Sequence, residues 1–358
     1  MDHIKVLKRA WHIVWNYRML WVFGIILALT TGGGGFNGGS NTGGGNYGGN
    51  GGNGNFPPFD NFSWPEISPQ MVTALIIAGI ALVCLIIFLS IVATVARYVA
   101  ETSLIRMVDQ YEETGEKLSL RRGFRLGWSR TAWRLFLIDL LVSLPVTVVF
   151  ILLFLLAFAP LLLWITKSMV AGVIGTVATV GMFFLFLFLA IVVGAALRAL
   201  MHFFRRACAL EDIGVIEALR QGFDLVMRHW QDVLIMWLIM IGVSIGWAIG
   251  MVVITIVLIP VIILLIVVGG VLGGIPALLV WGLSSLFLGG AMPYILAAIV
   301  GIPIFILVMS VPWLFLGGLM EVFKSSVWTL TYRELRALEG LEVESPEAEQ
   351  EQLPESDD

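Results

Sequence analysis

The side chains of this sequence that could do chemistry are few and lie far apart along the chain. Its 358 residues include four histidines and two cysteines, which are His3, His12, His202, His229, Cys84 and Cys208. No Cys/His spacing typical of a metal site occurs, and no histidine lies inside an apolar run. Cys84 lies in an apolar run and Cys208 in a basic segment, so we expect no disulfide. The sequence therefore predicts neither a metal site nor a bound cofactor.

Catalytic patterns are also missing from the apolar segments. None of them carries two histidines four residues apart, a nucleophile elbow or a pair of carboxylates. A hydrolase embedded in a membrane needs a nucleophile with a base within reach, and no histidine reaches the apolar interior. The Gly-rich stretch 32–55 lacks the flanking strand and the Lys-Ser/Thr pair of a phosphate-binding loop. We therefore expect a protein that is not an enzyme and has no nucleic-acid partner.

Asp139 is the candidate intramembrane polar site. It lies about one to two turns into an apolar segment, and Arg134 and Arg130 precede it. An ionisable group inside a membrane is by default a functional hypothesis, because it is costly to bury there. Two interpretations remain open. Asp139 pairs with one of these arginines at the membrane interface, or it binds a substrate or ion at the mouth of a cavity.

These side chains must be positioned by apolar helices. Hydrophobic residues make up 59% of the chain and charged residues only 13%, against about 25% charged in soluble domains. The apolar runs match a bilayer core of about 30 Å and lack the alternation of β-barrel strands. Six segments stand out, at 15–31, 71–95, 134–158, 172–197, 233–259 and 294–319. The predicted fold is an all-α polytopic membrane helical bundle with about six transmembrane helices.

The segment 233–320 leaves the number of spans open between six and eight, because it contains no Asp, Glu, Lys or Arg. Two groups of helix-breaking residues interrupt it, namely Gly269, Gly270, Gly273, Gly274 and Pro276, then Gly289, Gly290 and Pro293. The piece between them, 276–288, is too short to span a bilayer. We interpret it as an interfacial or re-entrant helix on the outer side and favour six spans.

The basic residues predict the orientation. All of the 21 Lys and Arg residues except Lys167 lie in the N-terminal segment, in the segments after the second and fourth spans, or near the C-terminus. Such a bias marks the cytoplasmic side, so both termini are expected there. A basic start, a short apolar core and small residues near 28–31 leave a second interpretation open, in which residues 1–31 are a cleaved signal peptide.

A short pattern occurs three times before an apolar segment. Leu120-Arg121-Arg122-Gly123-Phe124 matches Leu219-Arg220-Gln221-Gly222-Phe223, and Leu7-Lys8-Arg9-Ala10-Trp11 is a weaker copy. Each predicts an amphipathic helix that lies in the membrane interface, here called an elbow. The predicted repeat unit is an elbow, a span, an outer loop and a second span, in units of about 1–105, 106–210 and 211–338. A chance match is the alternative, since basic and aromatic residues gather at any cytoplasmic membrane edge.

The elbows supply candidate lipid-headgroup contacts. These are Lys8, Arg9, Arg121, Arg122, Arg125, Arg220 and Arg228. Basic side chains near a membrane surface attract anionic headgroups. Membrane lipids with anionic headgroups are therefore the expected partners.

The three pentads, together with Ser326–Leu335 at the end of the last unit, carry a resemblance. The chain resembles the membrane domain that precedes the catalytic domain in some bacterial glycerophosphodiester phosphodiesterases, and related uncharacterised stand-alone membrane proteins. The resemblance covers most of residues 1–338 and rests on short motifs. It implies the architecture and a bacterial inner membrane. It transfers no activity, because no catalytic domain is expected after residue 338.

Residues 1–338 are predicted to form a single transmembrane domain, with one long loop inside it and one tail after it. Residues 32–55 are almost wholly Gly and Asn, and we expect a disordered outer loop. Residues 339–358 are rich in Glu and Asp and contain no basic residue, which predicts a disordered acidic cytoplasmic tail. The tail is expected to solvate the chain, with binding to a protein partner as the alternative.

These observations favour a non-enzymatic, lipid-interacting or scaffold protein of the bacterial inner membrane. The alternative is a transporter or permease for a lipid-like or amphiphilic substrate. A polar cavity that reaches the middle of the membrane would favour the transporter, whereas a closed helix contact around Asp139 would count against it.

Overall fold

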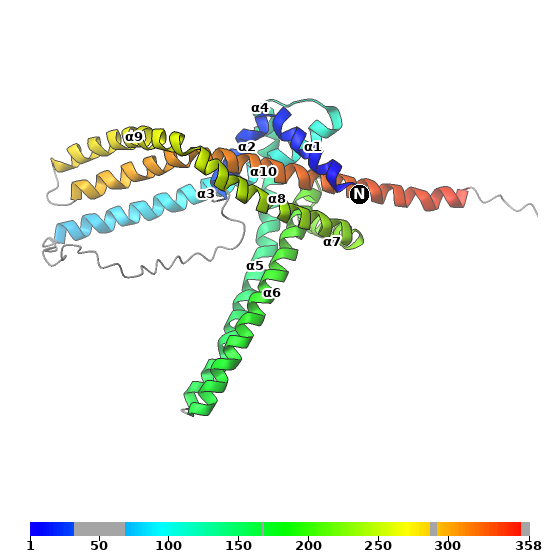
Figure 1. Ribbon diagram of the computed structural model, residues 1–358, viewed down its shortest axis with the longest axis horizontal. Coiled ribbons are helices and arrows are strands. Elements are labelled where there is room, and N and C mark those ends of the chain that lie inside the picture. The colour runs from blue at the N-terminus through cyan, green and yellow to red at the C-terminus, as the bar shows by residue number, and fades with distance from the viewer. Residues whose placement is uncertain (32–68, 167, 287–291, 352–358) are drawn as a thin grey trace, which may run out of the picture. The chain divides into compact units, whose positions relative to one another are not determined.

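The computed structural model describes residues 1–31, 69–166, 168–286 and 292–351. Throughout these ranges the chain is helical and contains no strand, which confirms the predicted all-α class. The elements are α1 (His3–Asn16), α2 (Met19–Thr30), α3 (Pro69–Thr114), α4 (Leu120–Gly127), α5 (Arg130–Phe158), the 3-10 helix η2 (Ala159–Thr166), α6 (Met169–Leu210), α7 (Val215–Arg228), α8 (Trp230–Val257), α9 (Ile259–Ser285) and α10 (Met292–Glu351) (Figure 1).

Six of the described helical stretches are long and apolar enough to cross a membrane. They are Val83–Thr114, Arg130–Ile165, Met169–Leu210, Trp230–Val257, Ile259–Ser285 and Met292–Glu339. Large apolar side chains on these helices are exposed, as Leu152 is at 60%. Such continuous exposed apolar surface is rare on soluble monomers but is what lipid requires. The chain is therefore a multi-pass membrane protein.

The N-terminal apolar segment differs from the prediction. The predicted span at 15–31 contains a bend, because α1 ends at Asn16 and meets α2 at an angle of 100°. Helix α2 has 12 residues and thus a length of only about 18 Å, short of a bilayer core of about 30 Å. The bend is held by Tyr17, whose buried hydroxyl donates to the Leu118 carbonyl at 2.9 Å. The α1–α2 pair adds a seventh crossing only if it is taken as one bent span.

The glycines of 269–274 do not interrupt the helix, contrary to the prediction. Helix α9 runs unbroken through them and through Pro276, so residues 276–285 are not a separate interfacial or re-entrant piece. A Cβ on Gly273 would lie 2.7 Å from the Gly301 carbonyl oxygen of α10, and one on Gly269 would lie 3.1 Å from Phe305. Small residues let two membrane helices approach closely. The glycines therefore serve to pack α9 against α10 and do not break the helix, contrary to the prediction. Residues 287–288 lie outside the described residues.

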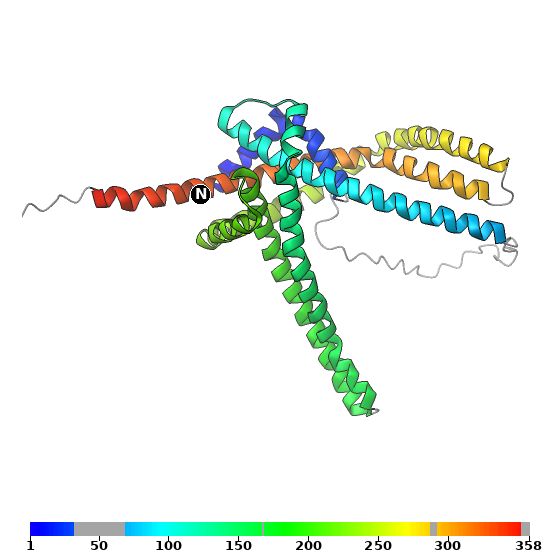
Figure 2. The ribbon, with the colours of Figure 1, turned by 180° about the vertical axis from the view of Figure 1, so that it is seen from behind.

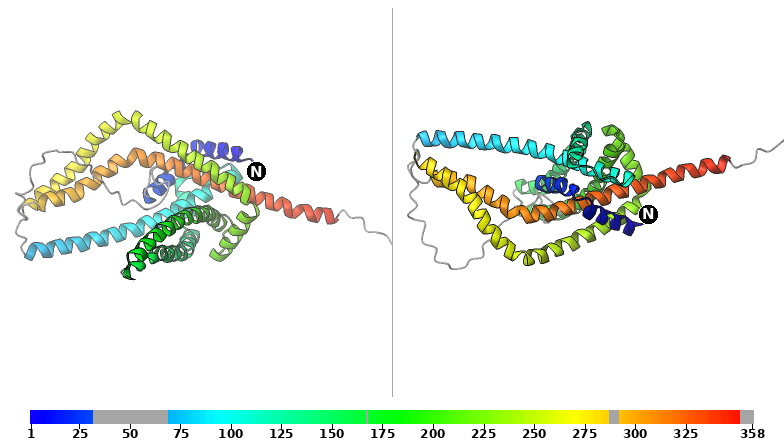
Figure 3. Two further views of the ribbon diagram at one scale, coloured as in Figure 1. Left: turned by 60° about the horizontal axis from the view of Figure 1, so that its bottom comes forward. Right: turned by 90° about the horizontal axis from the view of Figure 1, so that it is seen from above.

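The chain divides into two compact units, each built from separate segments. Unit 1 contains Met1–Gly24, Tyr98–Gly242 and Leu319–Asp358, and unit 2 contains Ile25–Arg97 and Val243–Gly318. Within unit 1, α5 and α6 form an antiparallel hairpin (Figure 2). Within unit 2, α9 and the first half of α10 lie side by side (Figure 3). Neither unit coincides with a predicted repeat unit, and the repeat remains a prediction.

The core of unit 1 lies at the charged ends of its long helices. Buried residues concentrate in 98–108 of α3, 203–209 of α6 and 322–335 of α10. Polar residues such as Thr102, Ser326 and Arg206 are among them. This core therefore combines apolar packing with polar contacts, which the next subsection describes.

The C-terminal segment also differs from the prediction. Helix α10 continues through residues 339–351, where the sequence predicted a disordered tail. Glu and Ala are good helix formers, and extending a helix that is already nucleated is favourable even though Pro346 lacks the backbone N–H. Residues 352–358 of the predicted tail lie outside the described residues, as does the predicted outer loop 32–55.

Candidate functional site

Three short helices stand at the predicted elbow positions. Helices α1, α4 and α7 are each followed by a residue outside the helical region, namely Tyr17, Trp128 and His229 with ψ angles of 71°, 63° and 35°. The next helices begin one or two residues later, at 19, 130 and 230. Each elbow is thus a helix, a one- or two-residue break and a second helix, as the sequence predicted locally.

Glycine fixes how α4 and α7 pack within unit 1. A Cβ on Gly123 would lie 2.3 Å from the Met107 sulfur, and one on Gly127 would lie 2.3 Å from the Val99 carbonyl oxygen. On α7 a Cβ on Gly222 would lie 2.7 Å from the Phe204 ring. The glycines of the α4 and α7 pentads therefore face the bundle.

The outward side of α4 is basic and aromatic. Arg121, Arg122 and Arg125 are exposed, and no carboxylate among the described residues lies within ion-pair distance of them. Phe124 and Trp128 are 49% and 63% exposed, and their rings stack with centroids 5.9 Å apart. We call these five residues the α4 surface.

The other two elbows carry basic residues that are partly neutralised. On α1, Arg9 donates to Glu112 of α3 at 2.9 Å, whereas Lys8 is exposed. On α7, Arg228 lies 4.0 Å from Glu339 and Arg220 is exposed. Helix α7 also contains Glu217 and Asp224, so its own charges balance. Of the seven candidate headgroup contacts, the three on α4 are therefore the most strongly cationic group.

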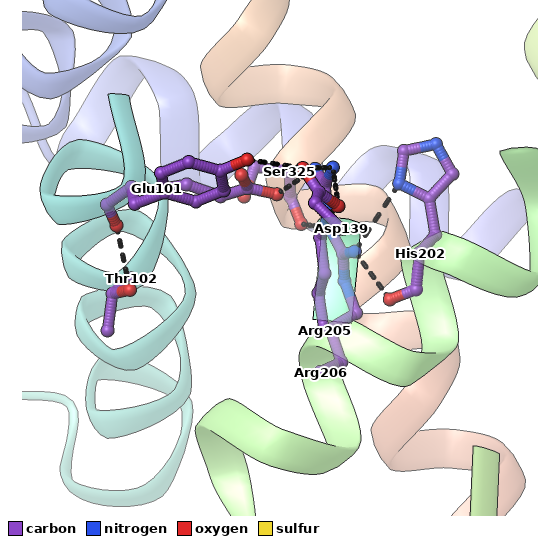
Figure 4. A network of polar contacts seen from close by, with 8 residues as sticks. Glu101, Thr102, Asp139, His202, Arg205, Arg206 and Ser325 are labelled. Carbon is purple, nitrogen blue, oxygen red and sulfur yellow. Dashed lines mark hydrogen bonds and ion pairs between the residues drawn. The ribbon is translucent and has the colours of Figure 1, made fainter. Parts of the chain in front are cut away.

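Asp139 lies in unit 1 inside a closed helix contact (Figure 4). Its carboxylate accepts from Arg205 of α6 at 2.5 and 2.6 Å and from the Tyr98 hydroxyl of α3 at 2.7 Å. The predicted pairing with Arg134 or Arg130 is wrong. Five residues correspond to about 140° around a helix, so Arg134 points away from Asp139. Arg134 instead binds Asp212 at 3.2 Å.

Arg205 connects three helices. Its guanidinium donates to Asp139 of α5 and, at 2.7 Å, to Glu101 of α3. The three side chains are only 14%, 15% and 11% exposed. Charges removed from water require partners and hydrogen bonds, and here two carboxylates surround one guanidinium. The contact ties α3, α5 and α6 together.

Arg206 makes a second connection, from α6 to α10. It donates to the His202 carbonyl at 2.8 Å and to the Ser325 carbonyl at 3.2 Å, and it is 3% exposed. The His202 ring stacks on Trp328 with centroids 4.9 Å apart. The tandem arginines therefore face different helices, as Figure 4 shows.

Further ion pairs close the unit around the turn between α6 and α7. Asp212 has a φ of 51°, in the left-handed region that Asp tolerates better than most residues. Its carboxylate lies 3.4 Å from Arg106 and 3.2 Å from Arg134. Arg336 of α10 pairs with Glu211 at 3.1 Å. These contacts hold α3, α5 and α10 to the same turn.

Sequence reasoning missed Glu101, Tyr98 and Arg205 as partners of Asp139. A signal was present, since Glu101 is the one charged residue in the stretch 98–105, which directly continues the apolar run of α3. A buried carboxylate in such a stretch requires a cation. The choice among the available arginines depends on tertiary packing, which sequence spacing does not specify.

Comparisons with known proteins give a family but no described relative. Neither a curated protein nor a solved structure matches the chain. A family model matches residues 14–326, which include the end of α1, the elbows α4 and α7 and most of the long helices. On this match the chain belongs to DUF7544, a family of unknown function.

Proposed function

We propose that this protein is a non-enzymatic scaffold of the bacterial inner membrane that binds anionic lipid headgroups through the α4 surface. Both termini would then lie in the cytoplasm, as the basic residues predict. The likeness to the membrane domain of glycerophosphodiester phosphodiesterases belongs to the same proposal. This likeness supports a location in a bacterial membrane and does not suggest an enzymatic activity.

The observation that supports the proposal is the composition of the α4 surface. Three exposed arginines without ion-pair partners among the described residues surround a stacked Phe and Trp. Guanidinium groups bind phosphate by paired hydrogen bonds, and Trp rings favour the level of the headgroups. A basic residue near an anionic surface contributes about 1 kcal/mol. Three together would distinguish anionic from zwitterionic lipids.

The transporter alternative has no such support. The sequence offered Asp139 as its polar site, and Asp139 is engaged by Arg205 and Tyr98 in a closed contact. The same contact has an evident structural role, since it joins three helices. We therefore do not propose transport.

Native mass spectrometry of the purified full-length protein, titrated with phosphatidylglycerol or phosphatidylcholine, tests the proposal. The variant R121Q/R122Q removes two charges from α4, and R220Q/R228Q removes two from α7 as a matched control. Loss of about 2 kcal/mol predicts about 30-fold weaker phosphatidylglycerol binding for the α4 variant. The α7 variant should change much less, because Glu217 and Asp224 already offset its arginines.

Phosphatidylcholine binding should be similar in all three proteins. Equal losses in the two variants, or no preference of the unmodified protein for the anionic lipid, would show that the α4 surface is not a headgroup site.

A further inference from the structure

A cavity of about 210 Å³ lies in unit 1, away from the α4 surface. Its walls come from α1, α3 and α10 and include Lys5, Arg9, Glu112, Arg333 and Glu334. Binding sites for drug-sized ligands measure about 300–1,000 Å³, so this cavity suits a smaller molecule. The charged residues of the wall are three cations and two carboxylates.

Three of these side chains already have ion-pair partners. Arg9 donates a hydrogen bond to Glu112 at 2.9 Å, and a second guanidinium nitrogen forms an ion pair with the other carboxylate oxygen. Arg333 pairs with Asp109 and donates to its carbonyl at 3.0 Å. These contacts fix the cavity wall, and each guanidinium keeps N–H groups that these contacts do not use.

Lys5 and Glu334 are different, because both lack an ion-pair partner among the described residues. Lys5 is exposed on α1, and within the described residues its backbone amide donates to Asp2 while its ammonium group has no hydrogen-bond partner. The Glu334 carboxylate lines the cavity, and one of its oxygens is buried without a hydrogen-bond partner in the described part of the chain. A buried carboxylate oxygen without a donor is costly, so a missing donor is indicated there.

We propose that this cavity binds a small zwitterion that carries a phosphate and an ammonium group, of the phosphoethanolamine type. The ammonium group of the ligand donates to Glu334, and its phosphate accepts from Lys5. The adjacent guanidinium groups of Arg9 and Arg333 favour a phosphate over a carboxylate, because their remaining N–H groups can bind several of its oxygens. The ligand can be a free compound or the headgroup of phosphatidylethanolamine.

Binding is measured by isothermal titration calorimetry on the full-length protein in nanodiscs that contain only phosphatidylcholine. Three probes are compared, namely O-phosphoethanolamine, inorganic phosphate and ethanolamine. O-Phosphoethanolamine should bind most tightly, because only it engages both ends of the site. Equal affinity for phosphate and O-phosphoethanolamine, or no binding of any probe, overturns the proposal.

Two variants assign the two ends. Glu334→Gln should weaken O-phosphoethanolamine by about tenfold, the size of one charge-assisted hydrogen bond, and leave phosphate unchanged. Lys5→Gln should weaken both probes by about tenfold for the same reason. Since Lys5 is exposed, its variant keeps the test valid if Glu334→Gln fails to fold. Glu116→Gln and Lys117→Gln, both exposed and outside the cavity, are the matched controls.

One comparison distinguishes a lipid headgroup from a free compound as the ligand, and a second distinguishes the cavity from the α4 surface. If nanodiscs that contain phosphatidylethanolamine abolish binding of O-phosphoethanolamine, the lipid occupies the cavity, and if binding persists, the free compound does. The α4 variant R121Q/R122Q should bind O-phosphoethanolamine normally. Unaltered binding of O-phosphoethanolamine by both Glu334→Gln and Lys5→Gln would contradict the proposed site, since neither side chain would then contact the ligand.

Discussion

Arg205 shows how a single residue determines the architecture of unit 1. Its guanidinium lies between carboxylates of α3 and α5, so the cost of burying each charge is offset by the others. The sequence identified Asp139 as unusual but assigned it the wrong cation. Helical spacing indicates which residues of one helix share a face. It does not indicate which helix packs against that face.

Removal of one member of this contact should destabilise the protein strongly. Asp139→Ala leaves Arg205 with a single carboxylate, and loss of one partner of a buried pair costs about 3–5 kcal/mol. The free energy of unfolding by sodium dodecyl sulfate in mixed micelles is the measurement. Asp224→Ala, an exposed carboxylate of α7 without an ion pair among the described residues, is the control and should change stability by less than about 0.5 kcal/mol. Similar stabilities of the two variants would contradict the structural role.

Tyr98→Phe tests the same site with a smaller change. The variant removes the hydroxyl that donates to Asp139 at 2.7 Å and keeps the ring. A hydrogen bond to a charged group contributes about 1.5–3 kcal/mol. The same unfolding assay should therefore place Tyr98→Phe between the unmodified protein and Asp139→Ala. Unchanged stability of Tyr98→Phe would show that the hydroxyl contributes nothing to the contact.

At the scale of the helices, a glycine can either end a helix or let two helices pack closely, and the sequence alone does not distinguish these roles. Helix class and most apolar runs follow from composition and run length, and the structure confirms the all-α class. The glycines of α9 misled the prediction because their packing partners lie on α10, distant in the sequence. In lipid a helix keeps its backbone hydrogen bonds despite glycine, since no water competes for them. Run length was therefore a better guide than breaker residues.

Adjacent glycines of α9 provide a matched test of this packing. A Cβ on Gly273 would lie 2.7 Å from the Gly301 carbonyl oxygen, whereas one on Gly274 meets nothing within 4 Å. Gly273→Ala should therefore cost about 1–3 kcal/mol by overpacking. Gly274→Ala should be neutral or slightly stabilising, because Ala is the better helix former. If the order of stability were reversed, α9 and α10 would not meet at Gly273.

At the scale of the whole molecule, the sequence predicts the arrangement of charge relative to the membrane. Composition was sufficient for a multi-pass protein, and six helices are long and apolar enough to cross. The number of crossings also depends on whether the bent α1–α2 pair counts as one. That bend depends on Tyr17 and a carbonyl about one hundred residues away. Local patterns carry no information about such a contact.

Cysteine labelling in a C84S/C208A background tests the proposed orientation. The Ser168→Cys variant places a thiol between η2 and α6, and Glu116→Cys places one between α3 and α4. The basic residues predict that a membrane-impermeant maleimide labels position 168 in intact spheroplasts and position 116 only after permeabilisation. Labelling in the opposite order would show that the protein has the inverted orientation and that the α4 surface does not face the cytoplasm.

Photocrosslinking at the elbows tests the central claim most directly, because it reports the lipid next to each surface in the native membrane. Phe124 of α4 and Phe223 of α7 occupy the same place in their pentads and are 49% and 46% exposed, so each can be replaced by p-benzoylphenylalanine. Adducts are then identified by mass spectrometry. If the α4 surface binds anionic headgroups, lipids crosslinked at position 124 are enriched in anionic headgroups relative to those crosslinked at position 223. The same lipid composition at both positions, or crosslinks at 124 to protein alone, would contradict it.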